Sequence, residues 1–501
     1  MAKAKQTPKR YILLPTSGLR ETPDAPKVNE FLTMLNSNAS VSPALSLKSK
    51  GGKNRKNFKL NVVDTIHEDG PKLVDINKED IPELKMSYPG LRLIPEVFYY
   101  PQRFLPFRVA FKSAAAAATT KTSFVITGSK DVPVVGARVV VFTDFSTRAG
   151  AEGVTNTKGI ASVALSSRTK VDRIYVYPKH SYWPYRISKP SLAGQPIKYA
   201  LTPIDFAFTD SLAFFYPPSS LTWLTQPVTV GVIDTGVGPH RDLPNIQGQN
   251  MIKGQDVTAF TDVEGHGTHV AGIIGAQANR PAGMRGLGAG VKIRSYRVFA
   301  DEKNGASNFD IMKAIVQAVA DGCDLLNLSL GGGDEDQGVA AAISDAYKKG
   351  VICFIASGND GRQPVSFPAA DQFSLAISAL GRNGLWPNNS TQADNVKGPA
   401  PSKDKKNFIA DFSNIGPQIS LTAPGVGIMS TFPGNFYAVM DGTSMACPAA
   451  TGAAARLLAG DVAILTAARD INRSNEMMKL FSTNAQSLGF TSEFEGKGLL
   501  K

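Results

Sequence analysis

Short apolar runs alternate with helical segments over the C-terminal half of the chain, from about residue 226 to residue 501. The expected strands are VTVGVID, KIRSYRV, LLNLSLGG, VICFIASGN and SLAISAL. The segments FDIMKAIVQAVADG and GVAAAISDAYKKG between them have the apolar spacing of helices. Continuous apolar strands separated by helices predict an α/β fold whose parallel sheet is covered by helices on both faces. Catalytic groups are then expected at the carboxyl ends of the strands.

A different pattern precedes this region and predicts a small α+β module in residues 1–105. FKLNVVDTIHEDGPKLVDI predicts two strands around an Asp69-Gly70 turn, EDIPELKMSYPG a short helix, and LRLIPEVFYY one further strand. Residues 106–122 form an expected linker, because the alanines of KSAAAAATTKTS lack the bulk to anchor a core. A short helix is the competing interpretation of that stretch.

Residues 123–190 have the sequence pattern of an all-β domain. The runs VPVVGARVVVF, GIASVALS and RIYVYP are β-branched or aromatic and are separated by turn sequences such as NTKG, which predicts a small β-sandwich. Residues 191–225 form a second linker, rich in proline near its end. The chain is therefore expected to hold three domains, the last spanning residues 226–501.

Positive charge is concentrated at the N-terminus. The 501 residues carry a formal net charge of +12, and residues 1–60 alone hold 12 basic and 3 acidic side chains. The stretch KSKGGKNRKNFK could contact an acidic partner or nucleic acid. It lacks interleaved aromatic residues and any nucleic-acid-binding motif, so a solvated loop is expected and nucleic acid is not.

Cysteine usage and the N-terminus bear on the compartment. Cys323, Cys353 and Cys447 are odd in number and lie in apolar or small-residue contexts, which is typical of buried thiols in a reducing compartment. The apolar run YILLP is too short for the core of a signal peptide, and no later run reaches transmembrane length. We therefore expect a cytoplasmic protein without a membrane partner, while export without a cleaved leader stays open.

Two polar residues follow predicted strands and are candidates for chemistry. Asp234 ends VTVGVID before a Thr-Gly-Val-Gly turn, where a carboxylate could serve catalysis, bind a metal or phosphate, or cap the next element. Asn359 ends VICFIASGN, and its amide could donate to a developing negative charge or simply form a turn beside Gly358. Another strand ends in SLGG, whose glycines leave backbone groups open to an extended peptide.

A histidine and a serine complete the set. His266 and His269 stand three apart in GHGTHVAGIIGA, which could indicate a metal pair, but the HExxH pattern is absent, so no metal site is expected there. Ser444 in DGTSMACPAATG could be a nucleophile or only the cap of a helix. The second glycine of the G-x-S-x-G elbow is replaced by Ala446. The order Asp, His, Ser is that of subtilisin, not of chymotrypsin or of the α/β-hydrolases.

These motifs together resemble one family. VIDTGV, GHGTHVAGI, NLSLGG, ASGN, TAPG, GTSMACP and GKGLL occur in the order found in subtilisin-like (subtilase, S8-type) serine peptidases, so residues 226–501 resemble their catalytic domain. The resemblance implies Asp234, His266 and Ser444 as the catalytic triad and Asn359 as the oxyanion-hole residue. It also implies nine residues that bind substrate: Ser329, Leu330, Gly331, Asn304, Gly305, Ala306, Ala356, Ser357 and Gly358.

The N-terminal domains also show resemblances. VVDTIHEDGPKLVDI with PGLRLIPEVFYY is similar to the inhibitory propeptides of subtilases, and GARVVVFTD with TNTKGIASVAL resembles the carboxypeptidase regulatory-like β-sandwich. Many relatives carry a calcium loop after the catalytic histidine. Here AQANRPAGMRGLGAG contains Arg280 and Pro281 and lacks acidic ligands, which argues against a structural calcium ion. No cofactor is expected for the chemistry itself.

The resemblance implies a serine endopeptidase that acts on protein or peptide substrates. A peptide-binding scaffold that has lost its chemistry is the alternative, and the presence of all four catalytic positions argues against it. We further expect residues up to about 105 to cover the cleft as an intramolecular inhibitor, with self-cleavage in residues 99–122 or 191–225. The β-sandwich could bind a partner, although its sequence carries no chemistry.

Overall fold

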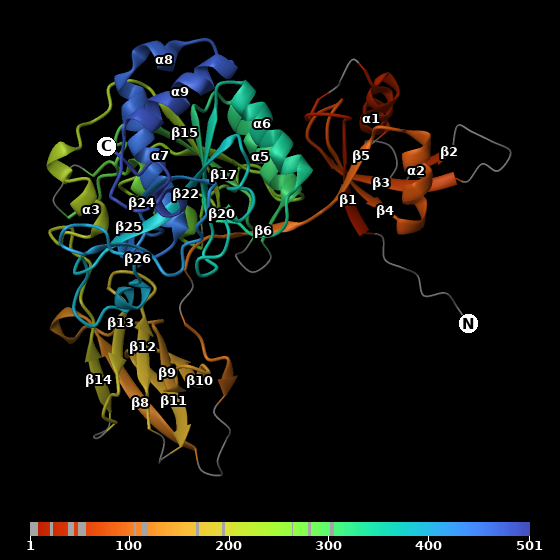
Figure 1. Cartoon of the computed structure of the whole chain (residues 1–501). Coiled ribbons are helices and arrows are strands. Elements are labelled where there is room, and N and C mark those ends of the chain that lie inside the picture. The colour runs from red at the N-terminus through yellow and green to blue at the C-terminus, as the bar shows by residue number, and fades with distance from the viewer. Residues whose placement is uncertain are drawn as a thin grey trace, which may run out of the picture.

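The computed structural model describes residues 9–20, 24–38, 45–48, 57–104, 107–112, 119–166, 170–192, 196–262, 264–278, 282–300 and 305–501. They form three bodies, which Figure 1 shows as a small N-terminal module, a β-sandwich and a large C-terminal domain. Among the helices of these described residues, none combines the length and hydrophobicity needed to cross a membrane.

The N-terminal module is a five-stranded sheet with the order β2-β3-β4-β1-β5. Its strands are β1 (Lys9–Leu14), β2 (Leu45–Lys48), β3 (Asn57–Thr65), β4 (Lys72–Ile76) and β5 (Arg92–Pro95). Helices α1 (Pro26–Asn38) and α2 (Ile81–Ser87) bury Phe31 and Leu84 against one face of the sheet. On the other face, Ile12 and Leu14 share a core with the C-terminal domain. The module is therefore packed against that domain by apolar burial.

The single strand expected for LRLIPEVFYY is wrong, because the structure divides it into two strands. β5 pairs antiparallel with β1 inside the module. The chain then leaves this sheet, and β6 (Phe98–Pro101) joins two strands of the C-terminal domain. Only two residues separate the strands, so the sheet of the module leads directly into the C-terminal domain.

The β-sandwich packs two sheets, ordered β13-β12-β9-β10-β7 and β11-β8-β14. Its strands are β7 (Phe111–Lys112), β8 (Thr119–Thr127), β9 (Arg138–Asp144), β10 (Ala149–Val154), β11 (Ile160–Ser166), β12 (Arg173–Tyr177), β13 (Tyr185–Ser188) and β14 (Ile197–Ala200). Phe124, Val141 and Ile174 belong to the core between the sheets. The sandwich strands thus run past both limits of the expected range 123–190. Residue 106 and residues 113–118 of the expected linker lie outside the described residues, so the competing helix is not tested over the alanines, and β8 begins at Thr119.

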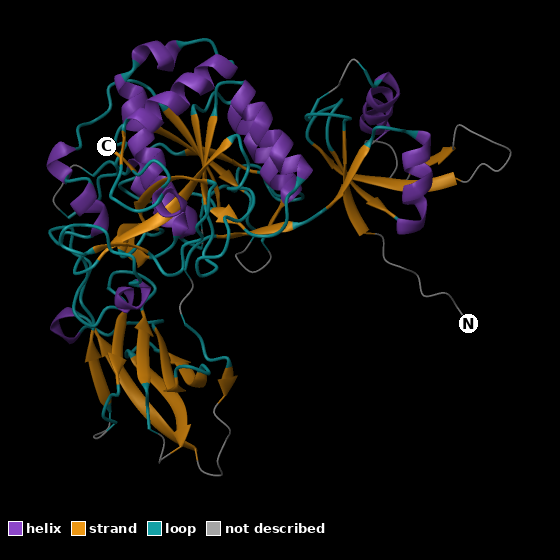
Figure 2. Cartoon of the chain, in the orientation of Figure 1, coloured by secondary structure: helices purple, strands orange, loops and turns teal. Residues whose placement is uncertain are grey.

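The C-terminal domain is built on an eight-stranded sheet, shown in Figure 2 with helices on both faces. Its path is β16-β17-β15-β19-β21-β22-β23, and β24 pairs with β22. The strands are β15 (Thr229–Asp234), β16 (Gln247–Asn250), β17 (Lys292–Arg297), β19 (Leu325–Leu328), β21 (Ile352–Ala356), β22 (Ser374–Arg382), β23 (Asn407–Ile409) and β24 (Ile419–Pro424). Only the β22–β23 pairing is antiparallel. Every residue of β21 is buried, as a strand covered on both faces requires. The predicted α/β fold with a parallel sheet is confirmed.

Two groups of helices cover this sheet. α4 (His266–Gly275), α7 (Thr443–Gly460) and α9 (Ile471–Thr483) bury residues in one core, while α5 (Asn308–Ala320) and α6 (Gln337–Lys348) pack in the core shared with the N-terminal module. The smaller elements are β18 (Ala306–Ser307), β20 (Leu330–Gly331), α3 (Ser211–Phe215), β25 (Ile428–Phe432), β26 (Phe436–Met440), α8 (Val462–Thr466), β27 (Ala485–Gln486), α10 (Ser492–Glu495) and β28 (Leu499–Leu500). The sheet therefore presents the carboxyl ends of β15, β19 and β21 at one edge, beside the starts of α4 and α7.

Candidate active site

A buried aspartate and a buried histidine form a hydrogen-bonded pair at this edge. Asp234 is the last residue of β15, and His266 is the first residue of α4. The Nδ1 atom of His266 lies 2.7 Å from Asp234 Oδ1, and the side chains are 0% and 1% exposed. The same carboxylate oxygen accepts from the Thr235 backbone N–H at 2.7 Å. The carboxylate therefore fixes the orientation of the imidazole and can stabilise a positive charge on it.

The close approach of α4 to β15 depends on a glycine next to the histidine. A Cβ atom at Gly267 would lie 2.1 Å from the Gly236 carbonyl oxygen and 3.1 Å from Asp234 Cβ. No side chain fits at 2.1 Å from a backbone atom, so only glycine lets the helix start this close to the strand.

A second carboxylate, Asp262, holds the start of α4. Its Oδ1 accepts from the backbone N–H of Gly265 at 2.8 Å, and its Oδ2 accepts from the backbone N–H and the hydroxyl of Thr268 at 2.8 and 2.6 Å. Thr235 donates its hydroxyl to Asp262 Oδ1 at 3.1 Å. Burial raises the pKa of Asp262. This residue was missed by sequence reasoning, and its place four residues before a helix that starts with a candidate histidine was the available signal.

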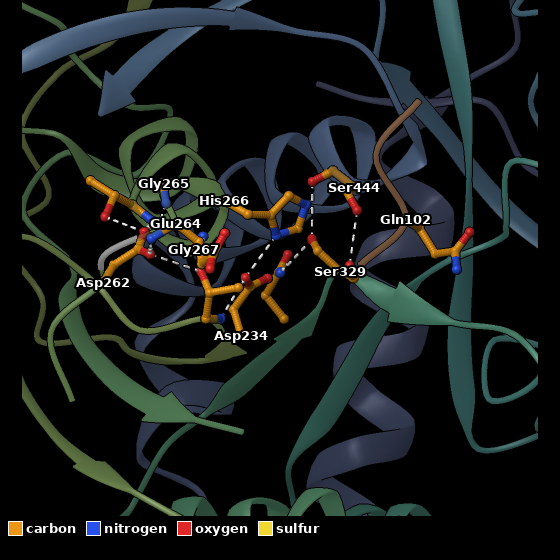
Figure 3. A network of polar contacts seen from close by, with 12 residues as sticks. Gln102, Asp234, Asp262, Glu264, Gly265, His266, Gly267, Ser329 and Ser444 are labelled. Carbon is orange, nitrogen blue, oxygen red and sulfur yellow. Dashed lines mark hydrogen bonds and ion pairs between the residues drawn. The ribbon is translucent and has the colours of Figure 1, made fainter. Parts of the chain in front are cut away.

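Ser444 lies on the other side of His266. Figure 3 shows the imidazole between Asp234 and Ser444. The Nε2 atom of His266 is buried and has no hydrogen-bond partner among the described residues, while the Ser444 hydroxyl donates to the Ser329 carbonyl at 2.9 Å. The ring nitrogen that a general base would use is thus left without a competing partner.

Ser444 is not a helix cap. α7 begins at Thr443, and its cap residue is Gly442, which has no side-chain capping bond. Ser444 is the second residue of the helix, so its backbone N–H is one of the free donors of the first turn. This N–H donates to the carbonyl oxygen of Gln102, which lies outside the helix.

The chain's own residues 98–104 run through the site in extended form. β6 lies between β18 and β20 and pairs antiparallel with both, Tyr99 opposite Ala306 and Tyr100 opposite Gly331. Beyond the strand, the Gln102 backbone N–H donates to Ser329 O at 3.0 Å. The backbone of this segment is therefore held by the two strands that flank it.

The carbonyl group of Gln102 sits at the start of α7. Its oxygen accepts from the Ser444 backbone N–H at 2.9 Å, and two residues later the Phe104 N–H donates to Asp441 O at 2.8 Å. Figure 3 shows Gln102 beside Ser444 and Ser329. The peptide bond between Gln102 and Arg103 is therefore the one presented to the Ser444 side chain.

Asn359 has the orientation that an oxyanion donor needs. Its Oδ1 accepts from the backbone N–H of Thr443 at 3.0 Å and from the Thr443 hydroxyl at 2.9 Å. Its Nδ2 is buried and has no partner among the described residues. Since the oxygen is occupied, the amide group can turn only its N–H donors toward the carbonyl of a bound chain.

The predicted substrate-binding residues fall into three groups. Ser329, Leu330 and Gly331 hold one side of residues 98–102, and Ala306 holds the other; a Cβ atom at Gly305 would lie 2.9 Å from Tyr99 O. In the second group, Ala356 is the last residue of β21, and Ser357 and Gly358 follow the strand. Gly358 donates its N–H to the Thr443 hydroxyl at 3.3 Å. Asn304 lies outside the described residues.

Comparison with known proteins identifies the domain. A family model described as the subtilase family matches residues 225–495, which is more than half of the chain. The chain belongs to the subtilase family. It is 33% identical to subtilisin DY of Bacillus licheniformis over 278 residues, which cover 54% of this chain and 88% of the relative. Subtilisin BL of Lederbergia lenta is 32% identical over 274 residues, covering 54% and 88% of the two chains.

A third relative, the minor extracellular protease Epr of Bacillus subtilis, is 34% identical over 238 residues, which cover 47% of this chain and 33% of that protein. The predicted resemblance to subtilases is confirmed, and the chain is a serine endopeptidase. The family match begins at residue 225, so the propeptide-like and regulatory-like assignments of the two N-terminal domains stay predictions.

His269 serves this subtilase as a structural residue. Its Nε2 lies 3.1 Å from Ile428 O and 3.2 Å from Ala438 O, and burial lowers its pKa to about 3. The ring is therefore neutral and joins α4 to the β25–β26 hairpin. Within the described residues, no three His, Cys, Asp or Glu side chains cluster in a way that could hold a metal ion, and Arg280 and Pro281 lie outside those residues. Subtilases need no cofactor for catalysis.

Proposed function

We propose that Asp234, His266 and Ser444 are the catalytic triad of this endopeptidase and that Asn359 completes its oxyanion hole. The hydroxyl of Ser444 turns from Ser329 O to His266 Nε2 and attacks the scissile carbonyl carbon, while His266 takes the hydroxyl proton. Asp234 holds the imidazole and stabilises its charge. Support comes from the 2.7 Å Asp234–His266 contact and from the unpartnered Nε2 atom beside the serine.

The tetrahedral intermediate places negative charge on the carbonyl oxygen. The backbone N–H of Ser444 and the Nδ2 group of Asn359 stabilise this charge at the N-terminus of α7, where the helix dipole also favours it. The bond to the leaving nitrogen then breaks, and His266 gives its proton to the new amine. Water hydrolyses the ester on Ser444 in the second half of the reaction and releases a carboxylic acid.

The enzyme is made, in this proposal, as an autoinhibited precursor that cleaves itself between Gln102 and Arg103. The observation that carries the proposal is the hydrogen bond from the Ser444 N–H to the Gln102 carbonyl oxygen. While β6 is paired with β18 and β20, no other peptide can pair with the same edges of these two strands. Of the two self-cleavage regions expected from the sequence, this observation favours residues 99–122 over the 191–225 linker.

The test compares intact masses of the purified wild-type chain and of Ser444→Ala. Wild-type protein is expected to yield fragments 1–102 and 103–501, whereas Ser444→Ala stays at full length. Ser482→Ala, on the exposed side of α9, is the matched control and should process normally. Equal full-length masses for wild type and Ser444→Ala would contradict self-processing.

A fluorophosphonate probe distinguishes the enzyme from the alternative of an inactive peptide-binding scaffold, because only an activated serine reacts with it. Processed wild-type protein should be labelled at Ser444, and unlabelled processed protein would refute the triad proposal.

A further inference from the structure

The β-sandwich is anchored beside the leaving-group side of the cleft. Asp394, in the short helix Thr391–Asn395, accepts from the Tyr175 hydroxyl at 2.9 Å and pairs with Arg173 and Arg186 of the sandwich. The ring of His180 stacks on Phe436 of β26 with centroids 3.8 Å apart. The segment 383–407 thus carries the carboxylate that holds the sandwich. Three polar partners on one partly buried carboxylate fix the two bodies relative to each other.

A cavity of about 380 Å³ lies at this junction and continues the path of the chain beyond Gln102. Its walls come from the sandwich (Arg138, Tyr177, Lys179), from the C-terminal domain (Glu264, Asp441) and from the connecting segment that begins at Arg103. A substrate that took the place of the first connector residues after Gln102 would enter the same cavity with the residues that follow its scissile bond.

The connecting segment itself belongs to the sandwich from Phe107 onward. The Phe107 ring lies edge-on to Tyr175 and Phe145, at centroid distances of 5.4 and 5.2 Å, and 4.3 Å below the guanidinium of Arg148. Its backbone N–H donates to the Tyr177 hydroxyl at 3.2 Å. Self-cleavage after Gln102 therefore leaves Phe107 and its neighbour Arg108 in place as part of the cavity wall.

The charges in this wall are mostly positive. Arg138 is half-buried, and its Nη1 atom is fully buried without a hydrogen-bond partner among the described residues. Arg108 and Lys179 add exposed positive charges. The carboxylate of Asp441 is already used by Gly427, Gln392 and Asn395, which leaves Glu264 as the other acidic residue of the described wall.

The connecting segment is itself positively charged, so its charges do not complement the positive wall of the cavity. Burial and the nearby positive charges of Arg108 and Arg103 lower the pKa of Arg138, although the Glu152 carboxylate on the neighbouring strand β10 opposes the shift. The positive charges of Arg103 and Arg108 in the connector thus repel the positive charge of Arg138 in the sandwich. A carboxylate in the same space would be attracted by Arg138 and would supply the acceptor that its buried Nη1 lacks.

We propose that the β-sandwich forms a substrate subsite, centred on Arg138, that binds an acidic side chain three to six residues after the scissile bond. The connector sets this range, because Phe107 and Arg108, which reach the sandwich, are the fifth and sixth residues after the Gln102 carbonyl. The subsite deepens the proposed endopeptidase function and rests on it. It makes the sandwich a part of the cleft that selects among protein substrates.

The experiment uses the self-processed full-length protein and quenched-fluorescence peptides that begin with Tyr-Tyr-Pro-Gln, the enzyme's own residues 99–102. Aspartate or asparagine is placed in turn at each of the third to sixth positions after the glutamine. At one or more of these positions we expect kcat/KM to be at least about fivefold higher for aspartate, and the ratio to fall as salt is raised. The same four residues linked to p-nitroaniline measure activity without the subsite.

Arg138→Gln is expected to remove the preference for aspartate while leaving the p-nitroanilide and asparagine substrates unaffected. Arg138→Glu should reverse it, so that lysine is preferred over asparagine. Lys198→Gln, which removes one exposed charge from β14 in the other sheet of the sandwich, is the matched control and should keep the preference. A flat aspartate scan, or a preference that survives in Arg138→Gln, overturns the subsite. Failure to hydrolyse the p-nitroanilide would instead overturn the proposed function.

Discussion

Asp310 gives the contact between the N-terminal module and the C-terminal domain a built-in response to pH. It lies in the first turn of α5 and is 8% exposed. Burial, with a further contribution from the nearby carboxylates Asp64 and Glu96 of the module, raises its pKa to about 7, although Lys313 and Arg10 oppose the shift. In the bound state this carboxyl group therefore holds its proton up to near-neutral pH.

The direction of the effect follows from proton linkage. Once the cleaved module dissociates, Asp310 faces water and its pKa returns toward about 3.9. The bound state then holds more protons than the released state, so inhibition strengthens as the pH falls from about 7 toward about 4. With these two pKa values, the inhibition constant is about twentyfold lower at about pH 5.5 than at about pH 7.5, or about 2 kcal/mol.

The assay measures hydrolysis of Tyr-Tyr-Pro-Gln-p-nitroanilide by processed protein in which fragment 1–102 is still present. Asp310→Asn, which is neutral at every pH, should be inhibited more strongly than wild type, and the ratio of the two inhibition constants should shrink by more than about tenfold between about pH 7.5 and about pH 5. Taking the ratio of the two proteins at each pH cancels every other pH effect that both proteins share. A ratio that does not change between these pH values would refute the assignment to Asp310.

Two further predictions concern the oxyanion hole and the docking of the sandwich. Asn359→Ala removes one of the two proposed donors and should lower kcat by about 10²- to 10³-fold with a smaller change in KM, as measured on the p-nitroanilide; a change of less than about tenfold would show that the amide does not reach the oxyanion. Asp394→Asn weakens the contacts with Arg173 and Arg186, and hydrogen exchange of β12 and β13 should become faster while self-processing continues. Unchanged exchange in these strands would show that the sandwich is held by other contacts.

The sequence predicted the parts of the site that depend on local pattern. Apolar strands that end in Asp234 and Asn359 placed both residues at one edge of a parallel sheet, and the order of the motifs identified the family. Ser444 alone allowed a capping role, and only the structure shows that it is the second residue of α7, with its N–H on the Gln102 carbonyl. Cytoplasmic location stays a prediction.

What the sequence missed depends on contacts between distant segments. The division of LRLIPEVFYY into two strands is decided by partners more than 200 residues away, since Tyr99 pairs with Ala306 and Tyr100 with Gly331. Asp262 and Asp394 carry no motif, because their roles come from groups gathered around them in space. Local hydrophobic periodicity contains no information on such pairings.

The strand that crosses the cleft has a consequence for how this protease can change. In the proposed maturation, residues 98–102 fit the cleft well enough to block it, and the bond after them is cut before the enzyme acts on other substrates. In this proposal, the sequence of residues 98–102 is itself a peptide sequence that the cleft of the enzyme accepts. A substitution in Gly305 or Gly331 that alters selectivity toward other proteins will also alter how the molecule matures, unless β6 changes with it. Under the proposed maturation, substrate selectivity and self-cleavage depend on the same strand-pairing residues, so a substitution that changes one of them also changes the other.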